Sequence, residues 1–165
     1  MLEKKHLEYR EKIRAFMTET IEPGAAKLDV EQRFPDEYIK PLTDVGLMSA
    51  LIPEEYGGQP IDTVSYSIGV EEASRVCGST GILLAAHNSL GCYPIHRFGT
   101  EDQRKKYLTR AAQGEILAFG LSEPDAGSDA GGTRTMAIEK DDHWLVNGSK
   151  CWITVSYTHL RAHET

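Results

Sequence analysis

The chain contains the run FGLSEPDAGSD at residues 119–129, and this run is the most informative part of the sequence. Its apolar start predicts a short strand, and a dense cluster of turn formers follows. Pro124 removes a backbone donor and fixes φ, while Gly127 permits a positive φ. Short side chains such as those of Ser122 and Ser128 can bond nearby backbone groups. A strand that ends in this way presents donors and hydroxyls to a ligand, so the run predicts a binding loop.

The residues upstream of this loop begin with the spacing of amphipathic helices. Apolar residues repeat on one helical face over residues 9–20, and Pro23-Gly24 predicts that this helix ends or breaks there. Residues 36–45 predict a second helix that Gly46 ends. Pro41 should kink this helix or mark its start.

Three further helices are predicted before residue 114. Asp62 can cap the first of them. Residues 80–90 are nearly all apolar and predict a buried central helix. Thr100 opens the capping box TEDQ, which predicts a helix through Ala112. Residues 1–113 therefore predict an all-helical domain.

The sequence changes character after Gly114. Strand-like runs occupy residues 115–121, 133–139, 144–146 and 150–154. Asp141-Asp142 predicts a turn, and Asn147-Gly148 is the strongest short-range hairpin signal in the chain. The predicted fold class is α + β. The helical domain at residues 1–113 is followed, over residues 114–154, by an incomplete antiparallel β-barrel-like domain with an exposed edge.

The composition narrows the classes of function. The 25 acidic and 18 basic residues give a net charge of −7, which argues against a nucleic-acid-binding protein, since such proteins usually have a basic face. The three cysteines are far apart and form no CxxC motif, which fits reduced thiols better than a disulfide framework or a zinc site. No signal peptide or membrane-spanning run is visible. The sequence therefore predicts a cytoplasmic protein without a nucleic-acid or membrane partner.

Trp152 and Thr154 share one face of the last predicted strand, because side chains alternate along a strand. An isoalloxazine ring needs an aromatic or apolar surface and hydrogen-bond donors, which the protein supplies to the cofactor. Trp152 could give the surface, and Thr154 and Ser122 could give donors. A tryptophan in a strand is also a common core residue, so the residues alone leave both interpretations open.

Five segments occur in the order in which they occur in one enzyme family. They are PEEYGG at residues 53–58, EEASR at 71–75, FGTEDQRKKYL at 98–108, the run at 119–129, and NGSKCWIT at 147–154. On these motifs the chain resembles the N-terminal part of an acyl-CoA dehydrogenase, and the last two motifs are the most specific. Residues 85–91 (AAHNSLG) are similar to the short-chain, butyryl-CoA type branch, a weaker signal that a packed helix end would also explain.

The resemblance implies an FAD site whose residues can be named by position. The implied cofactor-binding residues are Phe119, Leu121, Ser122, Gly127, Ser128, Trp152, Ile153 and Thr154. Leu121 and Ser122 would lie near the pyrimidine ring, Trp152 beside the flavin ring, and the Thr154 hydroxyl near N5. Ser128 would also bind substrate, at the thioester arm of the acyl-CoA.

The resemblance also implies a reaction, the α,β-dehydrogenation of a short-chain acyl-CoA thioester with hydride transfer to flavin N5. Electrons would pass on to an electron-transfer flavoprotein, and the full-length enzyme would be a homotetramer. No catalytic residue is assigned, because the family's carboxylate base lies in a later helical domain and must reach the α proton directly. Glu123 is expected to bond local backbone, and His87 and His96 are expected to be surface or core histidines.

The resemblance breaks after Thr154, where the family pattern expects Asn-Gly or Asn-Ala. Residues 155–165 fit neither that pattern nor the next strand. An assembly or adapter artefact is the first explanation, and truncation by a frameshift is the second. The chain alone is expected to lack the base, to bind FAD poorly and to be inactive. Two rival functions stay open: an acyl-CoA oxidase-type or nitroalkane oxidase-type enzyme on the same fold, and a non-catalytic helical interaction protein.

Overall fold

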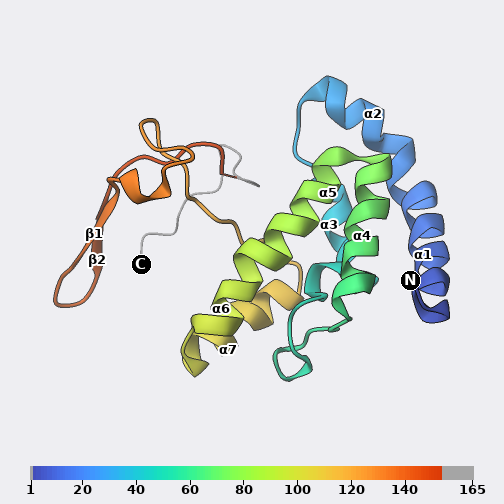
Figure 1. Cartoon of the computed structure of the whole chain (residues 1–165), viewed down its shortest axis with the longest axis horizontal. Helices are drawn as coiled ribbons and strands as arrows, with labels where there is room; N and C mark the ends of the chain where they lie inside the picture. The colour runs from blue at the N-terminus through green and yellow to red at the C-terminus, as the bar shows by residue number, and fades with distance from the viewer. Residues whose placement is uncertain (1, 154–165) are drawn as a thin grey trace. The chain divides into compact units, whose positions relative to one another are not determined.

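The computed structural model describes residues 2–153 of the chain (Figure 1). These residues form two compact units that divide after Leu117. The first unit is helical and the second contains a small antiparallel sheet, so the predicted α + β class is confirmed. Within the described residues no helix is both long and apolar enough to cross a membrane.

The helical unit is organised around α4. Its α-helices are α1 (Lys4–Phe16), α2 (Glu22–Glu31), α3 (Asp36–Asp44), α4 (Thr63–Val76), α5 (Gly78–Ala85), α6 (Tyr93–Phe98) and α7 (Glu101–Ala112). Two π-helical segments (Met17–Ile21, Ala86–Cys92) and two 3-10 turns (Leu47–Ser49, Glu54–Tyr56) connect them. Helix α4 packs against α1 and α5, and α6 packs against α7 (Figure 1).

The prediction that the first helix ends at Pro23 is wrong. The chain passes from α1 through the π-helical turn Met17–Ile21 into α2, which carries Pro23 in its first turn. A proline is tolerated there because a wider π turn precedes it, and because the N–H groups of a helix's first turn have no partner within the helix. Gln32 ends α2 with a left-handed backbone at φ 51°. Pro41 likewise lies inside α3 rather than at its start.

The predicted helix caps are confirmed. Asp62 Oδ1 accepts the N–H groups of Val64 and Ser65, both at 3.1 Å, and α4 begins at the next residue. Thr100 accepts the Gln103 N–H, and the Gln103 side chain accepts the Thr100 N–H in return. Such caps are local in sequence, which is why they can be read from a few residues.

The predicted central helix at residues 80–90 is only partly buried. It forms α5 and the π-helical segment Ala86–Cys92, and its side chains Leu83 and Leu84 are each 1% exposed. Ile82 is 60% exposed and Leu90 is 45% exposed. The prediction of a buried helix is therefore wrong for these two side chains, although α5 packs against α4 and the π-helical segment contacts the Leu47–Ser49 turn.

A buried carboxylate joins α1 to α4. Glu72 is 1% exposed and accepts two hydrogen bonds from Arg14, at 2.8 and 3.0 Å, and a third from Arg75 at 3.1 Å. The Arg14 guanidinium, followed by Arg75, holds the pKa of Glu72 below its ordinary value. A buried charge with these partners is costly to leave unpaired, so the pair fixes how the two helices meet.

His87 joins three parts of the helical unit. It is fully buried, its Nε2–H donates to the Met48 carbonyl at 2.8 Å, and its Nδ1 accepts the Leu117 N–H at 3.1 Å. These two bonds require the neutral ring, with the proton on Nε2. Burial lowers the pKa of His87 from 6.5 to about 4. The expectation of a core histidine is confirmed for His87. Its bond to Leu117 holds the last residue of the helical unit in place.

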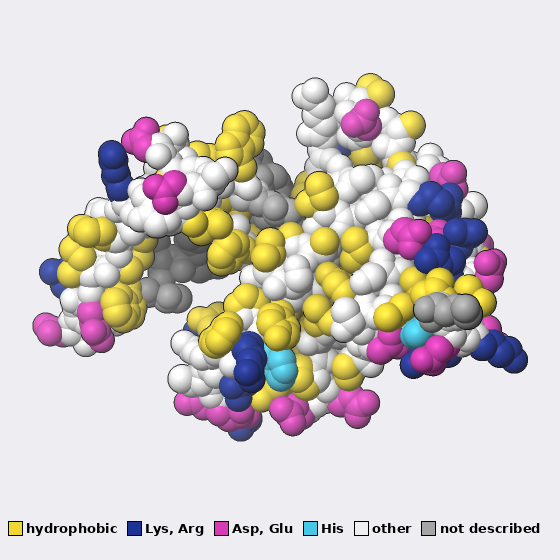
Figure 2. Space-filling model, viewed as in Figure 1, with side chains coloured by type: hydrophobic (Ala, Val, Ile, Leu, Met, Phe, Trp, Pro, Cys, Tyr) yellow, Lys and Arg dark blue, Asp and Glu magenta, His cyan; other side chains and the backbone are white. Residues whose placement is uncertain are grey.

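The second unit contains one hairpin. Strands β1 (Met136–Glu139) and β2 (Trp144–Asn147) pair antiparallel, with Ile138 opposite Leu145. Asp141-Asp142 lies in the turn, as predicted. The prediction of a second hairpin turn at Asn147-Gly148 is wrong, because residues 150–153 form no strand that could pair with β2. Figure 2 shows hydrophobic side chains on the surface of this hairpin.

Two further predicted strands are absent from the described residues. Residues 115–121 and 150–153 have no strand assignment there, although Cys151 N–H donates to the Ser122 carbonyl at 2.9 Å. A strand needs a ladder of such bonds with a neighbour. Within residues 2–153 this is the one backbone bond between the two stretches of chain, and it is made by Ser122, so their extended sequence pattern does not develop into a sheet.

The state of His87 predicts a pH dependence of stability. Between pH 6.5 and about 4 the unfolded chain binds a proton that the folded chain does not, so the unfolding free energy should fall as the pH falls. The part of the unfolding free energy that is linked to His87 is fully present above pH 6.5. Its loss between pH 6.5 and about 4 is on the order of 3 kcal/mol. Urea unfolding at a series of pH values measures it.

His87→Gln keeps a donor and an acceptor but does not titrate, and it should remove this part of the pH dependence. His143→Gln, at an exposed histidine of the second unit, is the matched control and should leave it unchanged. An unchanged slope in the His87→Gln variant would contradict the assignment.

Candidate functional site

The two most specific sequence motifs lie side by side in the second unit. The bond from Cys151 N–H to the Ser122 carbonyl joins them. Gly120 also approaches the second motif, because a Cβ at this position would lie 3.5 Å from Ile153 Cδ1. The structure therefore brings together the segments at residues 119–123 and 150–153, which are about thirty positions apart in the sequence.

The carboxylate of Glu123 connects the loop to other segments of the second unit. Its side chain is 6% exposed, and it accepts the backbone N–H of Arg134 at 2.6 Å and that of Thr135 at 3.0 Å. The ammonium group of Lys150 donates to the same carboxylate at 2.8 Å. These donors, with the Arg134 N–H first, lower the pKa of Glu123 to about 2. Glu123 does bond backbone groups, but the prediction of local partners is wrong, because both N–H groups come from the start of the hairpin and not from the loop.

The loop after Glu123 makes a tight turn. Glu123 and Ala126 exchange backbone hydrogen bonds at 2.9 and 3.2 Å, with Pro124 and Asp125 between them. Gly127 does not use the positive φ that the sequence suggested. A Cβ at Gly127 would meet nothing within 4 Å, and Ser128 is exposed, so both residues stand in open space.

The apolar residues predicted at the site differ in their exposure. Trp152 is 92% exposed, and Phe119 and Leu121 are 43% and 44% exposed. Trp152 also has a left-handed backbone at φ 57°, which is uncommon for a bulky residue. Ser122 and Ile153 are half-buried, while Thr154 and the tail at residues 155–165 lie outside the described residues. Within the described residues Trp152 is therefore not a core tryptophan, which was the alternative interpretation.

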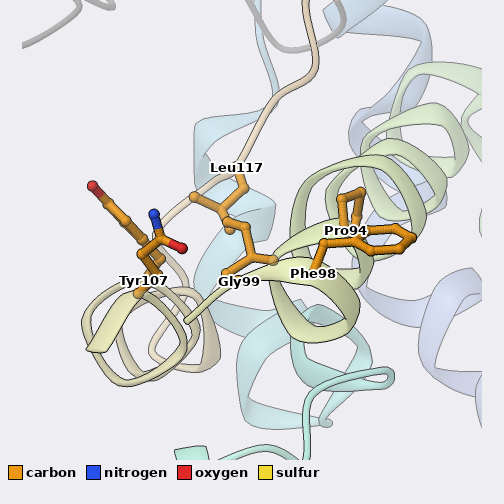
Figure 3. A pocket seen from close by; sticks show the side chains of 7 residues that line it. Pro94, Phe98, Gly99, Tyr107 and Leu117 are labelled. Carbon is orange, nitrogen blue, oxygen red and sulfur yellow. The ribbon is translucent and has the colours of Figure 1, made fainter. Parts of the chain in front are cut away.

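The helical unit has an apolar groove that sequence patterns did not indicate (Figure 3). Its volume is about 440 Å³, and its lining residues are Pro94, Ile95, Phe98, Gly99, Gln103, Tyr107 and Leu117. Figure 3 shows Leu117 between Tyr107 of α7 and Phe98 of α6. The groove depends on how α6, α7 and Leu117 pack together, and it leaves Phe98 82% exposed.

No group of His, Cys, Asp and Glu side chains within residues 2–153 could hold a metal ion. Cys92 is buried 3.5 Å from His87 Nε2, and burial raises the pKa of its thiol to about 12. Cys77 is also buried, so these two cysteines are packing residues, as predicted.

Comparison with known proteins assigns both units. Residues 3–115 match the N-terminal domain of acyl-CoA dehydrogenases, and residues 118–160 match the middle domain of the same enzymes. The chain belongs to the acyl-CoA dehydrogenase family. The boundary between the two matches agrees with the division of the structure after Leu117.

Two bacterial relatives align with most of the chain. It is 49% identical over 146 residues to a probable acyl-CoA dehydrogenase, YngJ, of Bacillus subtilis. It is 46% identical over 146 residues to the short-chain specific acyl-CoA dehydrogenase of Clostridium acetobutylicum. Each alignment covers 88% of this chain but 38% of the relative, so the chain spans well under half the length of these acyl-CoA dehydrogenases.

A solved structure gives the same result in three dimensions. The acyl-CoA dehydrogenase of Bacillus anthracis complexed with FAD superposes with a TM-score of 0.84 at 36% identity. That match covers 92% of this chain and 27% of the other chain. The described fold is therefore that of the acyl-CoA dehydrogenase family.

The exposure of Trp152 can be tested by quenching of its fluorescence. Trp144→Phe leaves Trp152 as the single tryptophan, and acrylamide should quench its emission nearly as strongly as that of a free tryptophan derivative. Trp152→Phe is the control, because it leaves Trp144, which is 58% exposed and should be quenched less. Weaker quenching of Trp152 than of Trp144 would contradict the described geometry.

Proposed function

We propose that this chain is part of an FAD-dependent acyl-CoA dehydrogenase that acts on short-chain acyl-CoA thioesters. The observation that carries the proposal is the pairing of residues 119–123 with residues 150–153, which leaves Trp152 uncovered beside them. This pairing occurs in a chain that belongs to the acyl-CoA dehydrogenase family.

The residues present fit a flavin. An isoalloxazine ring needs a flat apolar surface, and the indole of Trp152 and the side chains of Phe119 and Leu121 offer apolar surface that no described residue covers. Its pyrimidine edge needs polar groups, and the half-buried Ser122 lies next to Leu121. When bound, FAD would supply the acceptor for the two electrons that leave the substrate.

Each site residue has a proposed role. Leu121 and Ser122 bind the pyrimidine edge, and Trp152 packs beside the ring with Ile153 behind it. Gly127 lets the loop pass close to the cofactor, and Ser128 holds the thioester arm of the acyl-CoA. Phe119 adds apolar surface, and Thr154 donates its hydroxyl to the flavin.

The base that removes the α proton is proposed to come from the part of the relatives that this chain does not span. Glu123 is unsuited to this role because its carboxylate already accepts two backbone N–H groups and a lysine ammonium. Its low pKa also makes it a weak base near neutral pH.

The proposed preference for short acyl chains rests on a relative, and the proposed partners rest on the family. The Clostridium relative is short-chain specific, and we propose the same substrate class for this chain. An electron-transfer flavoprotein would accept the electrons, a homotetramer would be the assembled enzyme, and the cytoplasm would be its compartment.

A spectroscopic titration tests the proposed function. The gene product that contains this chain should purify with bound FAD, and anaerobic butyryl-CoA should bleach its visible absorbance within the mixing time. A longer acyl-CoA should bleach it more slowly. Flavin that is stable to acyl-CoA, or a protein that retains no flavin, would contradict the proposal, and rapid reoxidation by oxygen would favour the oxidase-type alternative.

A further inference from the structure

Lys150 belongs to the motif at residues 147–154 and contacts the motif at residues 119–129. Its Nζ donates to the Glu123 carboxylate at 2.8 Å and to the Leu121 carbonyl at 3.0 Å. Its side chain is 24% exposed. Two of its three N–H donors are therefore used within the loop segment, and the Glu123 carboxylate balances its charge.

Glu123 extends this contact to a third segment. The carboxylate also accepts the N–H groups of Arg134 and Thr135, which precede β1. One side chain thus joins the loop, the start of the hairpin and the chain that leaves the hairpin. Gly148 allows this close approach, because a Cβ there would lie 2.7 Å from the Thr135 Cα.

The position of this pair relates it to the proposed flavin site. Glu123 directly follows Ser122, and Lys150 precedes Trp152 by two residues. Between them runs the single backbone bond from Cys151 to Ser122, at 2.9 Å. Within residues 2–153 the two segments have no ladder of backbone bonds, so the two hydrogen bonds of Lys150 and this one backbone bond set their separation.

We propose that Glu123 and Lys150 act as a clamp that sets the spacing between the two flavin-lining segments. This inference rests on the proposed function. Lys150 is then a positioning residue that acts through Leu121 and Trp152, and it does not bind the phosphates of the substrate. A partly buried pair suits this role, because loss of either partner leaves the other charge without its match.

The test uses the gene product that contains this chain, with Lys150→Met, Lys150→Arg, Glu123→Gln and the double variant Glu123→Gln/Lys150→Met. Lys150→Met should weaken FAD binding by roughly tenfold and change the visible circular dichroism of the bound flavin. Lys150→Arg should restore most of both, because it keeps the charge. The double variant should bind FAD no more weakly than the single variant with the lower FAD affinity, since the two residues form one contact.

Three controls separate this role from simple stability. Lys140→Met changes an exposed lysine in the hairpin turn and should leave FAD binding and the flavin spectrum unchanged. The urea midpoint of each variant shows whether it folds. Amide exchange of Cys151 in the flavin-free protein should be faster in Lys150→Met than in Lys140→Met, which tests the clamp even if the protein binds no flavin.

Two results would overturn the inference. One is a folded Lys150→Met variant with unchanged FAD affinity, flavin spectrum and Cys151 exchange. The other is a selective rise in the KM for acyl-CoA that high salt abolishes, which would make Lys150 an anion-binding residue. Failure of the parent protein to bind any flavin would instead defeat the proposed function, and Cys151 exchange would still decide the clamp.

Discussion

A carboxylate whose side chain is 6% exposed has to be met by donors, and the donors that meet Glu123 come from two other segments of the second unit. Desolvation of the charge makes these bonds obligatory rather than optional. The hairpin supplies two backbone N–H groups and Lys150 supplies the counter-charge. The loop at residues 119–129 is therefore tied to the chain at residues 150–153, which brings Ser122 next to Cys151 and leaves Trp152 exposed beside them.

The helical unit relies on the same physical rule at two places. Glu72 is buried against arginines from α1 and from its own helix, which fixes the contact between α1 and α4. His87 is buried as a neutral ring between the Met48 carbonyl and the Leu117 N–H. Apolar burial supplies most of the driving force for folding, whereas these polar contacts decide which segments lie next to each other. His87 in particular determines where the chain leaves the helical unit.

Local signals in the sequence predicted much of the fold. The caps at Asp62 and Thr100 and the turn at Asp141-Asp142 depend on neighbouring residues, and all three were read correctly. Pro23 was misread because the π-helical turn before it removes the conflict between proline and helix. Asn147-Gly148 was misread because residues 150–153 make too few bonds to form a strand that could pair with β2. The first error concerns the backbone geometry of neighbouring residues, and the second depends on whether a segment finds a pairing partner, which the sequence does not show.

The candidate site shows the same division. Resemblance to the acyl-CoA dehydrogenase motifs named its residues, but the partners of Glu123 and the exposure of Trp152 emerged only from the fold. The most direct measurement is a crystal structure of the flavin-loaded gene product. The account predicts a flavin ring packed beside Trp152, its pyrimidine edge at Leu121 and Ser122, and an intact pair between Glu123 and Lys150. A flavin bound elsewhere, or a Trp152 covered by protein with no flavin beside it, would contradict the account.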